Sequence, residues 1–139
     1  MGIANRIVLP QKFNIDGTGV DHFCHGQAGT WKWLGAVIVP HATLAAHATN
    51  VQTCTLKKGV GGTAISNALN NDTDDLTDGN VAWTVGVARN FTVVGKGKDL
   101  EFGATDIMEA SVVEGGTVAG LDATIMHTFE QVGGSGGDR

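Results

Sequence analysis

The chain has 139 residues, of which 17% are charged, and its formal net charge is −5. The length fits one domain with a single core, and so few charges indicate that another protein covers part of the surface, unless Gly, Ser, Thr and Asn hydrate it. The acidic balance and the scattered Lys and Arg argue against a nucleic-acid partner, because phosphate contacts require clustered cations.

The first residues, from Met1 to Arg6, lack the basic segment and the following apolar stretch of a secretion signal. No apolar run reaches the roughly 18 residues that a membrane-spanning helix needs. We therefore expect a protein that is synthesised in the cytoplasm and has no membrane partner. In that reducing compartment the two cysteines, Cys24 and Cys54, are expected to be free thiols.

Two breaks interrupt the first 29 residues: Pro10 ends a short apolar segment, and Asp16–Gly19 forms the second break. Because proline lacks a backbone donor and is confined to sheet edges, we predict that Met1–Gly29 is an extended arm with at most one edge strand. An apolar arm outside a core packs on a neighbouring molecule, so the expected interface contacts are Ile7, Val8, Leu9 and Phe13. The alternative is that this segment adds a strand to the chain's own sheet.

The segment Thr30–Val39 is rich in β-branched and aromatic residues, and it places Trp31 and Trp33 on one face of a predicted strand. Because Trp is common both in cores and in interfaces, these two side chains are either core residues or interface anchors. A second strand is predicted at Asn50–Lys58, where the alternation gives Cys54 the place of a small buried hydrophobic residue.

Short strands separated by polar turns are predicted between residues 63 and 98. Thr63–Asn67 and Phe91–Val94 are short strand candidates, and Gly95–Lys98 forms a turn. Asn70–Asn80 is a polar acidic loop. Val81–Ala88 alternates strictly, which predicts a strand with a large core-facing side made of Val81, Trp83, Val85 and Val87.

The last candidate hairpin consists of Asp106–Glu114 and Leu121–Val132, joined by a glycine-rich link. One face of its second strand is predicted to be buried, and that face holds Leu121, Ala123, Ile125, His127 and Phe129. No stretch of the chain shows helical periodicity. The prediction is therefore an all-β, antiparallel β-sandwich, jelly-roll-like, over residues 30–132, between an N-terminal arm (1–29) and a flexible glycine-rich tail (133–139).

Four groups of residues contain side chains of the kinds found in chemical sites. The ligands that zinc prefers occur in His22–His25, but no second pair completes a set of four. His41 and His47 have no nucleophile in a recognisable turn beside them, and His127, on an apolar face, is typical of a hydrogen-bonded core histidine. Asp72–Gly79 departs from the carboxylate spacing of a calcium loop. We therefore predict no metal, no cofactor and no catalytic residue.

Four consecutive patterns carry a resemblance to a known family of proteins. They are VPHATLAAHATN at 39–50, VQTCTLKK at 51–58, GVGGTAIS at 59–66 and DLEFGATDIMEASVVEGGTVAGLDATIMHTFEQ at 99–131. This stretch is similar to the small β-sandwich proteins on the heads of tailed bacteriophages, which are known as decoration, cement or head-stabilisation proteins. The resemblance covers about two thirds of the chain, from Val37 to Gln131.

The resemblance implies a non-enzymatic virion protein on the capsid exterior. It further implies two partners, the major capsid protein and the chain itself as a homotrimer, and a role in stabilising the capsid lattice. Another virion β-module, such as a tail or head-fibre base domain, is the first alternative. A carbohydrate-binding β-sandwich is the second, although three Trp and no Tyr provide a thin sugar platform.

Overall fold

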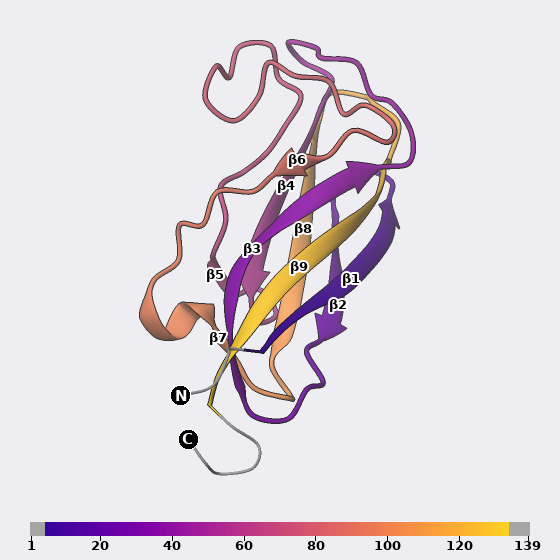
Figure 1. Cartoon of the computed structure of the whole chain (residues 1–139). Coiled ribbons are helices and arrows are strands. Elements are labelled where there is room, and N and C mark those ends of the chain that lie inside the picture. The colour runs from indigo at the N-terminus through magenta and orange to yellow at the C-terminus, as the bar shows by residue number, and fades with distance from the viewer. Residues whose placement is uncertain (1–4, 134–139) are drawn as a thin grey trace.

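The computed structural model describes residues 5–133 and shows two antiparallel sheets packed face to face (Figure 1). This arrangement confirms the predicted all-β sandwich. Sheet A has the order β1-β9-β3-β6, with β7 also paired to β3; its strands are β1 (Arg6–Ile15), β9 (Leu121–Gly133), β3 (Thr30–Pro40), β6 (Arg89–Asn90) and β7 (Glu101–Phe102). Sheet B has the order β2-β8-β4-β5; its strands are β2 (Gly19–Cys24), β8 (Ile107–Gly115), β4 (Val51–Lys58) and β5 (Thr63–Ala64).

The core lies between the sheets and follows the alternation of the long strands. β9 buries the five side chains predicted from its period of two, from Leu121 to Phe129, and β3 buries Trp31 and Trp33. From the other sheet, β4 buries Cys54 and Leu56. Each of these strands is hydrogen-bonded within its sheet and apolar on its inner face, which is the condition for a stable layer.

The prediction that residues 1–29 form an arm outside the sandwich is wrong for the part that the structure describes. β1 pairs with β9 over its whole length, and β2 pairs with β8. The alternative, a strand that completes the chain's own sheet, is what the structure has. Pro10 is tolerated because Asn5 C=O accepts from Gln131 N–H at 2.8 Å, which points the backbone of odd-numbered β1 residues toward β9 and that of Pro10 toward the open edge.

The structure describes only part of the two ends of the chain. Residues 1–4 of the predicted arm and residues 134–139 of the predicted tail are not among the described residues. Gly133, the first residue of that tail, is the last residue of β9 and lies opposite Thr30. No helix within residues 5–133 has the length and apolar character that a membrane crossing requires.

The predicted final hairpin is also wrong, because β8 and β9 belong to different sheets. The link between them crosses from sheet B to sheet A, and β1 and β2 are joined across the sandwich in the same manner (Figure 1). The alternation of each strand was read correctly, but alternation does not specify which strand is the partner.

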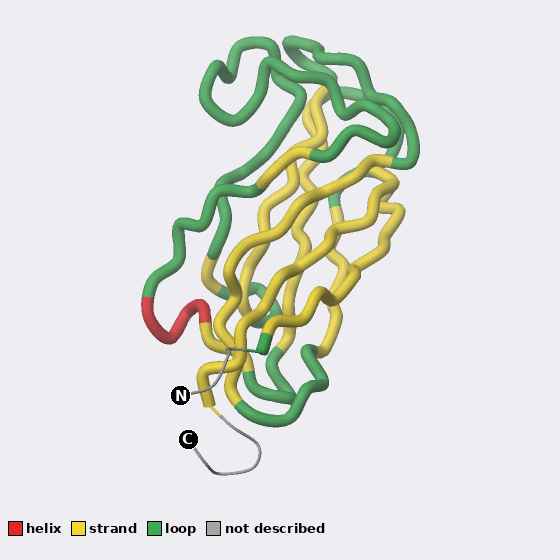
Figure 2. Tube along the Cα trace, viewed as in Figure 1, coloured by secondary structure: helices red, strands yellow, loops and turns green. Residues whose placement is uncertain are grey.

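The segment Val81–Ala88 alternates strictly and is nevertheless not a strand. Trp83 is buried, whereas Val81, Val85 and Val87 are half exposed. The segment belongs to a long connection, residues 65–106, which runs largely as loop along one side and one end of the sandwich (Figure 2). Within the same connection, the predicted strand Phe91–Val94 is replaced by the two-residue β6 and one bridge from Val93, and the turn at 95–98 continues into a 3-10 helix, Gly97–Leu100.

Candidate functional site

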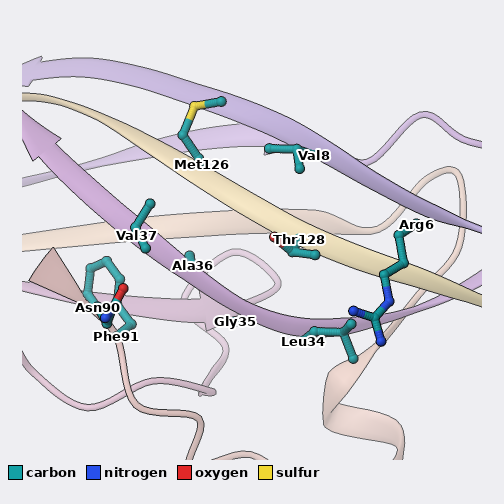
Figure 3. A pocket seen from close by; sticks show the side chains of 10 residues that line it. All are labelled: Arg6, Val8, Leu34, Gly35, Ala36, Val37, Asn90, Phe91, Met126 and Thr128. Atoms are coloured by element: carbon teal, nitrogen blue, oxygen red, sulfur yellow. The ribbon is translucent and has the colours of Figure 1, made fainter. Parts of the chain in front are cut away.

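An open hollow of about 530 Å³ lies on the outer face of sheet A (Figure 3). Three neighbouring strands form its floor: β1, β9 and β3. β6 and the residue after it close one side. The residues that line it are Arg6, Val8, Leu34, Gly35, Ala36, Val37, Asn90, Phe91, Met126 and Thr128.

A β-bulge in β3 coincides with this hollow. Trp33 lies opposite Phe129 and Gly35 lies opposite Thr128, so that Leu34 is an extra residue with no partner of its own. Gly35 has a φ of 138°, a conformation that favours glycine. The extra residue changes the parity of the strand: its buried positions are odd-numbered before the bulge and even-numbered after it, from Ala36 onward.

The hollow is lined mainly by apolar residues, with the polar Asn90 and Thr128 among them and one charged group at its end. Val8 and Met126 come from the adjacent strands β1 and β9, and Leu34 lies on the bulge of β3. Arg6 is the one charged residue in the lining, and its Nε donates to Glu130 Oε1 at 3.1 Å. A surface of this kind suits a protein partner, because apolar contact supplies the affinity and a guanidinium on the rim fixes the orientation.

The six residues predicted as interface contacts divide between this hollow and the core. Val8 lines the hollow and is exposed. Ile7 and Leu9 are partly buried and pack against the core from the inner face of β1. The other three, Phe13, Trp31 and Trp33, are buried in this chain's own core. Sequence reasoning therefore named one lining residue and missed the bulge, although Gly35 in the middle of a strand is the signal that a bulge gives.

A hydrogen-bonded trio was not predicted; it lies on the same face of sheet A, at the end where β3 finishes. His41 Nδ1 donates to Asp122 Oδ1 at 2.9 Å, and Thr124 Oγ1 donates to His41 Nε2 at 2.9 Å. This order is that of a nucleophile, a base and an orienting carboxylate. Acyl transfer also needs hydrogen-bond donors for the oxyanion. The backbone of Thr124 cannot supply one, because it pairs with Val39 in the ladder between β9 and β3. We interpret the trio as a brace that fixes the chain where it leaves β3.

The prediction that His127 is a hydrogen-bonded core histidine is confirmed. Trp33 Nε1 donates to His127 Nδ1 at 3.1 Å, and His127 Nε2 donates to Gln11 Oε1 at 2.9 Å. Gln11 Nε2 in turn donates to the backbone and carboxylate oxygens of Asp21, both at 3.0 Å. Burial lowers the pKa of His127 to about 3, so the ring is neutral. This chain of bonds runs from sheet A to β2 in sheet B.

The histidine–cysteine segment of β2 does not converge on a common point. His22 Nε2 donates to Glu109 Oε1 at 2.7 Å, while Cys24 Sγ donates to Ala104 O. His25 lies buried with its ring centroid 4.5 Å from that of Phe129, and burial lowers its pKa. Within residues 5–133, no group of three or more His, Cys, Asp or Glu is placed to hold a metal ion.

The Glu109 carboxylate fixes a turn rather than a ligand. Burial alone would raise its pKa, but hydrogen bonds from Gly61 N–H and from His22 outweigh burial and hold it below its usual value. The Gly61 bond is 2.9 Å long and ties the turn between β4 and β5 to the outer face of β8.

In the acidic loop at residues 70–80, the carboxylates of Asp72 and Asp75 accept hydrogen bonds from backbone N–H groups of the loop itself. Asp75 Oδ1 accepts from Thr77 N–H at 3.0 Å and from Asp78 N–H at 2.9 Å; the latter bond is the main reason why the pKa of Asp75 lies below its usual value. Arg89 donates to the carbonyl oxygens of Asn70 and Asp78 and lies over the Trp83 ring at 4.5 Å. The loop is therefore closed by a guanidinium of the same chain.

Comparison with known proteins assigns no family to the chain. No family model matches the chain, and no curated protein matches it. The candidate site rests on the hollow and its surroundings.

Proposed function

We propose that this chain is a non-enzymatic virion structural protein, which binds the outer surface of a phage capsid and stabilises its lattice as a homotrimer. Two observations support the proposal: the resemblance of residues 37–131 to phage decoration proteins, and an apolar hollow on an otherwise regular sheet face. The hollow carries the self-association part of the proposal, because an open and mainly apolar surface in a protein with 17% charged residues is a place for another protein. The capsid-binding part rests on the resemblance.

The hollow differs from an enzyme cleft in shape and in chemistry. Its lining holds no histidine and no carboxylate. The trio of Thr124, His41 and Asp122 lies outside the hollow, and its side chains are hydrogen-bonded to one another. General acid–base catalysis needs such groups around a bound substrate. A binding role uses only the features that the hollow has.

A carbohydrate-binding function is less well supported. A sugar platform needs exposed aromatic rings, and all three tryptophans are buried: Trp31, Trp33 and Trp83. Four of the five phenylalanines are buried as well, and Phe23 is partly buried. No observation favours a sugar ligand over a protein partner.

The other virion alternative, a tail or head-fibre base module, differs from our proposal only in the surface that is bound.

The proposed mechanism is stabilisation by mass action. A protein that binds the assembled shell and not its separated subunits shifts the equilibrium toward the shell. A trimer contacts the shell at three equivalent points, so contacts that are weak singly combine into stable attachment. The hydrogen-bonded sheets lower the ordering cost of this attachment, because the backbone of the sheet face is already formed in the free chain.

Co-sedimentation with phage heads tests the proposal. Purified chain is mixed with expanded heads that lack this protein, and we expect saturable binding with a fixed number of copies per head. Heads before expansion serve as the control and are expected to bind less. Binding to tails or fibres with no binding to heads would favour the alternative virion module instead.

A further inference from the structure

We propose that the hollow on sheet A receives the Leu76 side chain of a second copy, so that copies of this chain associate head to tail. The inference rests on the self-association part of the proposed function and does not depend on capsid binding. It assigns the occupant of the hollow and the residues on both sides of the contact.

Leu76 is the most exposed large hydrophobic residue in the described chain, at 80%. It lies in the turn between Asp75 and Asp78, and the Asp75 carboxylate accepts hydrogen bonds from the two backbone N–H groups that follow Leu76. Arg89 ties the base of the loop to the sandwich through two carbonyl oxygens. The structure thus presents an apolar side chain to solvent on a fixed loop, which lowers the ordering cost of docking it.

The charges beside Leu76 complement the charge beside the hollow. Asp74, two residues before Leu76, is exposed, and its backbone rather than its carboxylate is bonded within the loop. Arg6 uses its Nε on Glu130, and Figure 3 shows its guanidinium beside Leu34 at the end of the hollow. A guanidinium has further N–H donors on its terminal nitrogens, which suit a carboxylate such as that of Asp74.

The hollow has room for this pairing. The hollow, at about 530 Å³, is apolar where a leucine would enter, through Val8, Leu34 and Met126. The loop lies at one end of the sandwich and the hollow lies on a sheet face, so one copy's tip meets a different surface of the next copy (Figure 1). Contacts of this heterologous kind continue from copy to copy until a ring closes. A closed ring of three satisfies every tip and every hollow of the proposed trimer.

The experiment measures molar mass by light scattering over a range of concentrations, on the full chain without phage heads. We expect the wild type to form a trimer, and Leu76→Asp and Val8→Glu each to weaken association at least about tenfold, because each buries a carboxylate in an apolar contact. Matched controls are Val60→Asp, at a residue 70% exposed, and Val20→Glu, at 51% exposure against 52% for Val8. Both controls are expected to assemble like the wild type.

Mixing the two impaired variants identifies the contact as head to tail. Leu76→Asp keeps its hollow and Val8→Glu keeps its tip, so an equimolar mixture is expected to form dimers through the one intact contact and no larger species. Circular dichroism checks that each variant is folded, and Leu76→Ser replaces Leu76→Asp if that variant is not. A monomeric wild type, an assembled Leu76→Asp or Leu76→Ser, or a mixture that stays monomeric would overturn the inference.

The outcomes separate this inference from the proposed function. A wild type that is trimeric but does not bind heads would contradict capsid binding and leave the head-to-tail contact standing. A monomeric wild type that binds heads saturably would contradict the contact and leave capsid binding standing.

Discussion

β9 and the segment Val81–Ala88 have the same strict alternation of side chains and different structures. β9 has a hydrogen-bonded neighbour on each side, β1 and β3, and its inner face is buried. The segment Val81–Ala88 has one bridge, between Trp83 and Leu44, and it turns at Gly86, whose φ is 74°. The comparison teaches that alternation predicts a strand only where a free strand edge is available to pair with it.

The two regions also hold their core residues differently. In β9 the ladder positions a whole row of side chains, whereas in the long connection Trp83 is positioned singly. Its Nε1 donates to Gln52 O at 3.0 Å, and Arg89 covers its ring. One anchoring side chain thus replaces a ladder, and the valines around it are left exposed.

Replacing Trp83 by Ala tests this difference most severely. The variant loses a fully buried ring, the indole bond to Gln52 and the stacking surface of Arg89. We expect the free energy of unfolding in urea to fall by about 3–5 kcal/mol. Val85→Ala, in the same alternating row, is expected to change it by no more than about 0.5 kcal/mol because that side chain is half exposed. Equal losses at both positions would mean that the segment is a strand after all.

In β9, by contrast, the loss is expected at each inward position. Ile125→Ala should lower the free energy of unfolding by about 2–4 kcal/mol, since Ile125 is fully buried between the sheets. Thr124→Ala, its outward neighbour, loses only the exposed hydrogen bond to His41 and should cost less than about 1 kcal/mol. Urea titrations of the two variants measure the difference. A larger loss of unfolding free energy for Thr124→Ala than for Ile125→Ala would mean that the opposite face of β9 is the buried one.

The pH dependence of stability tests the polar chain that β9 carries through the core. Below pH 6.5 the unfolded chain protonates His127, while the folded chain does not do so until about pH 3. The stability held by the neutral ring is therefore complete above pH 6.5 and falls as the pH falls toward about 3. Between about pH 7.5 and about pH 5.5 we expect His127 to account for a loss of about 1.4 kcal/mol.

His127→Gln is the control for this titration, because it keeps a hydrogen-bonding side chain and removes the ionisable ring. The loss between the two pH values should shrink in the variant by about that same 1.4 kcal/mol. It should not vanish, because the lowered pKa values of His25 and Glu109 act in the same direction. An unchanged slope would show that the ring is not neutral in the folded chain.

The smallest expected effect concerns Arg89, which closes the acidic loop. Arg89→Lys keeps the positive charge, but it loses the planar group that lies over Trp83 and donates to two carbonyl oxygens at once. We expect a loss of about 1 kcal/mol in the free energy of unfolding. Amide hydrogen exchange should rise in the loop at residues 70–80 and stay unchanged in β9. Faster exchange in β9 would contradict the separation between the two regions.

Much of the fold was predictable because it follows from local alternation. The strands β3, β4, β8 and β9 and the buried face of β9, from Leu121 to Phe129, were predicted from their own residues. What alternation does not give is the partner. Arg6 bonds to Glu130, 124 residues away, and nothing in the pattern of β1 indicates β9 rather than a neighbouring molecule.

The site was less predictable for the same reason. The hollow is made where three strands distant in sequence meet a bulge, so its lining depends on register as well as on composition. Val8 was named for its apolar character, but Met126 and Thr128 lie on the face of β9 opposite the five residues predicted to be buried, and Met126 was not named at all. Gly35 was the one residue that signalled the bulge, because it is a glycine in the middle of a strand rich in β-branched and aromatic residues.

The temperature at which expanded phage heads come apart tests the central claim most directly. Heads that lack this protein are heated with increasing amounts of the purified chain, and their disruption is followed by light scattering and release of DNA. We predict that the disruption temperature rises and reaches a plateau at the same chain-to-head ratio at which binding saturates. A disruption temperature that stays unchanged while the heads are saturated with the chain would contradict a role in stabilising the capsid.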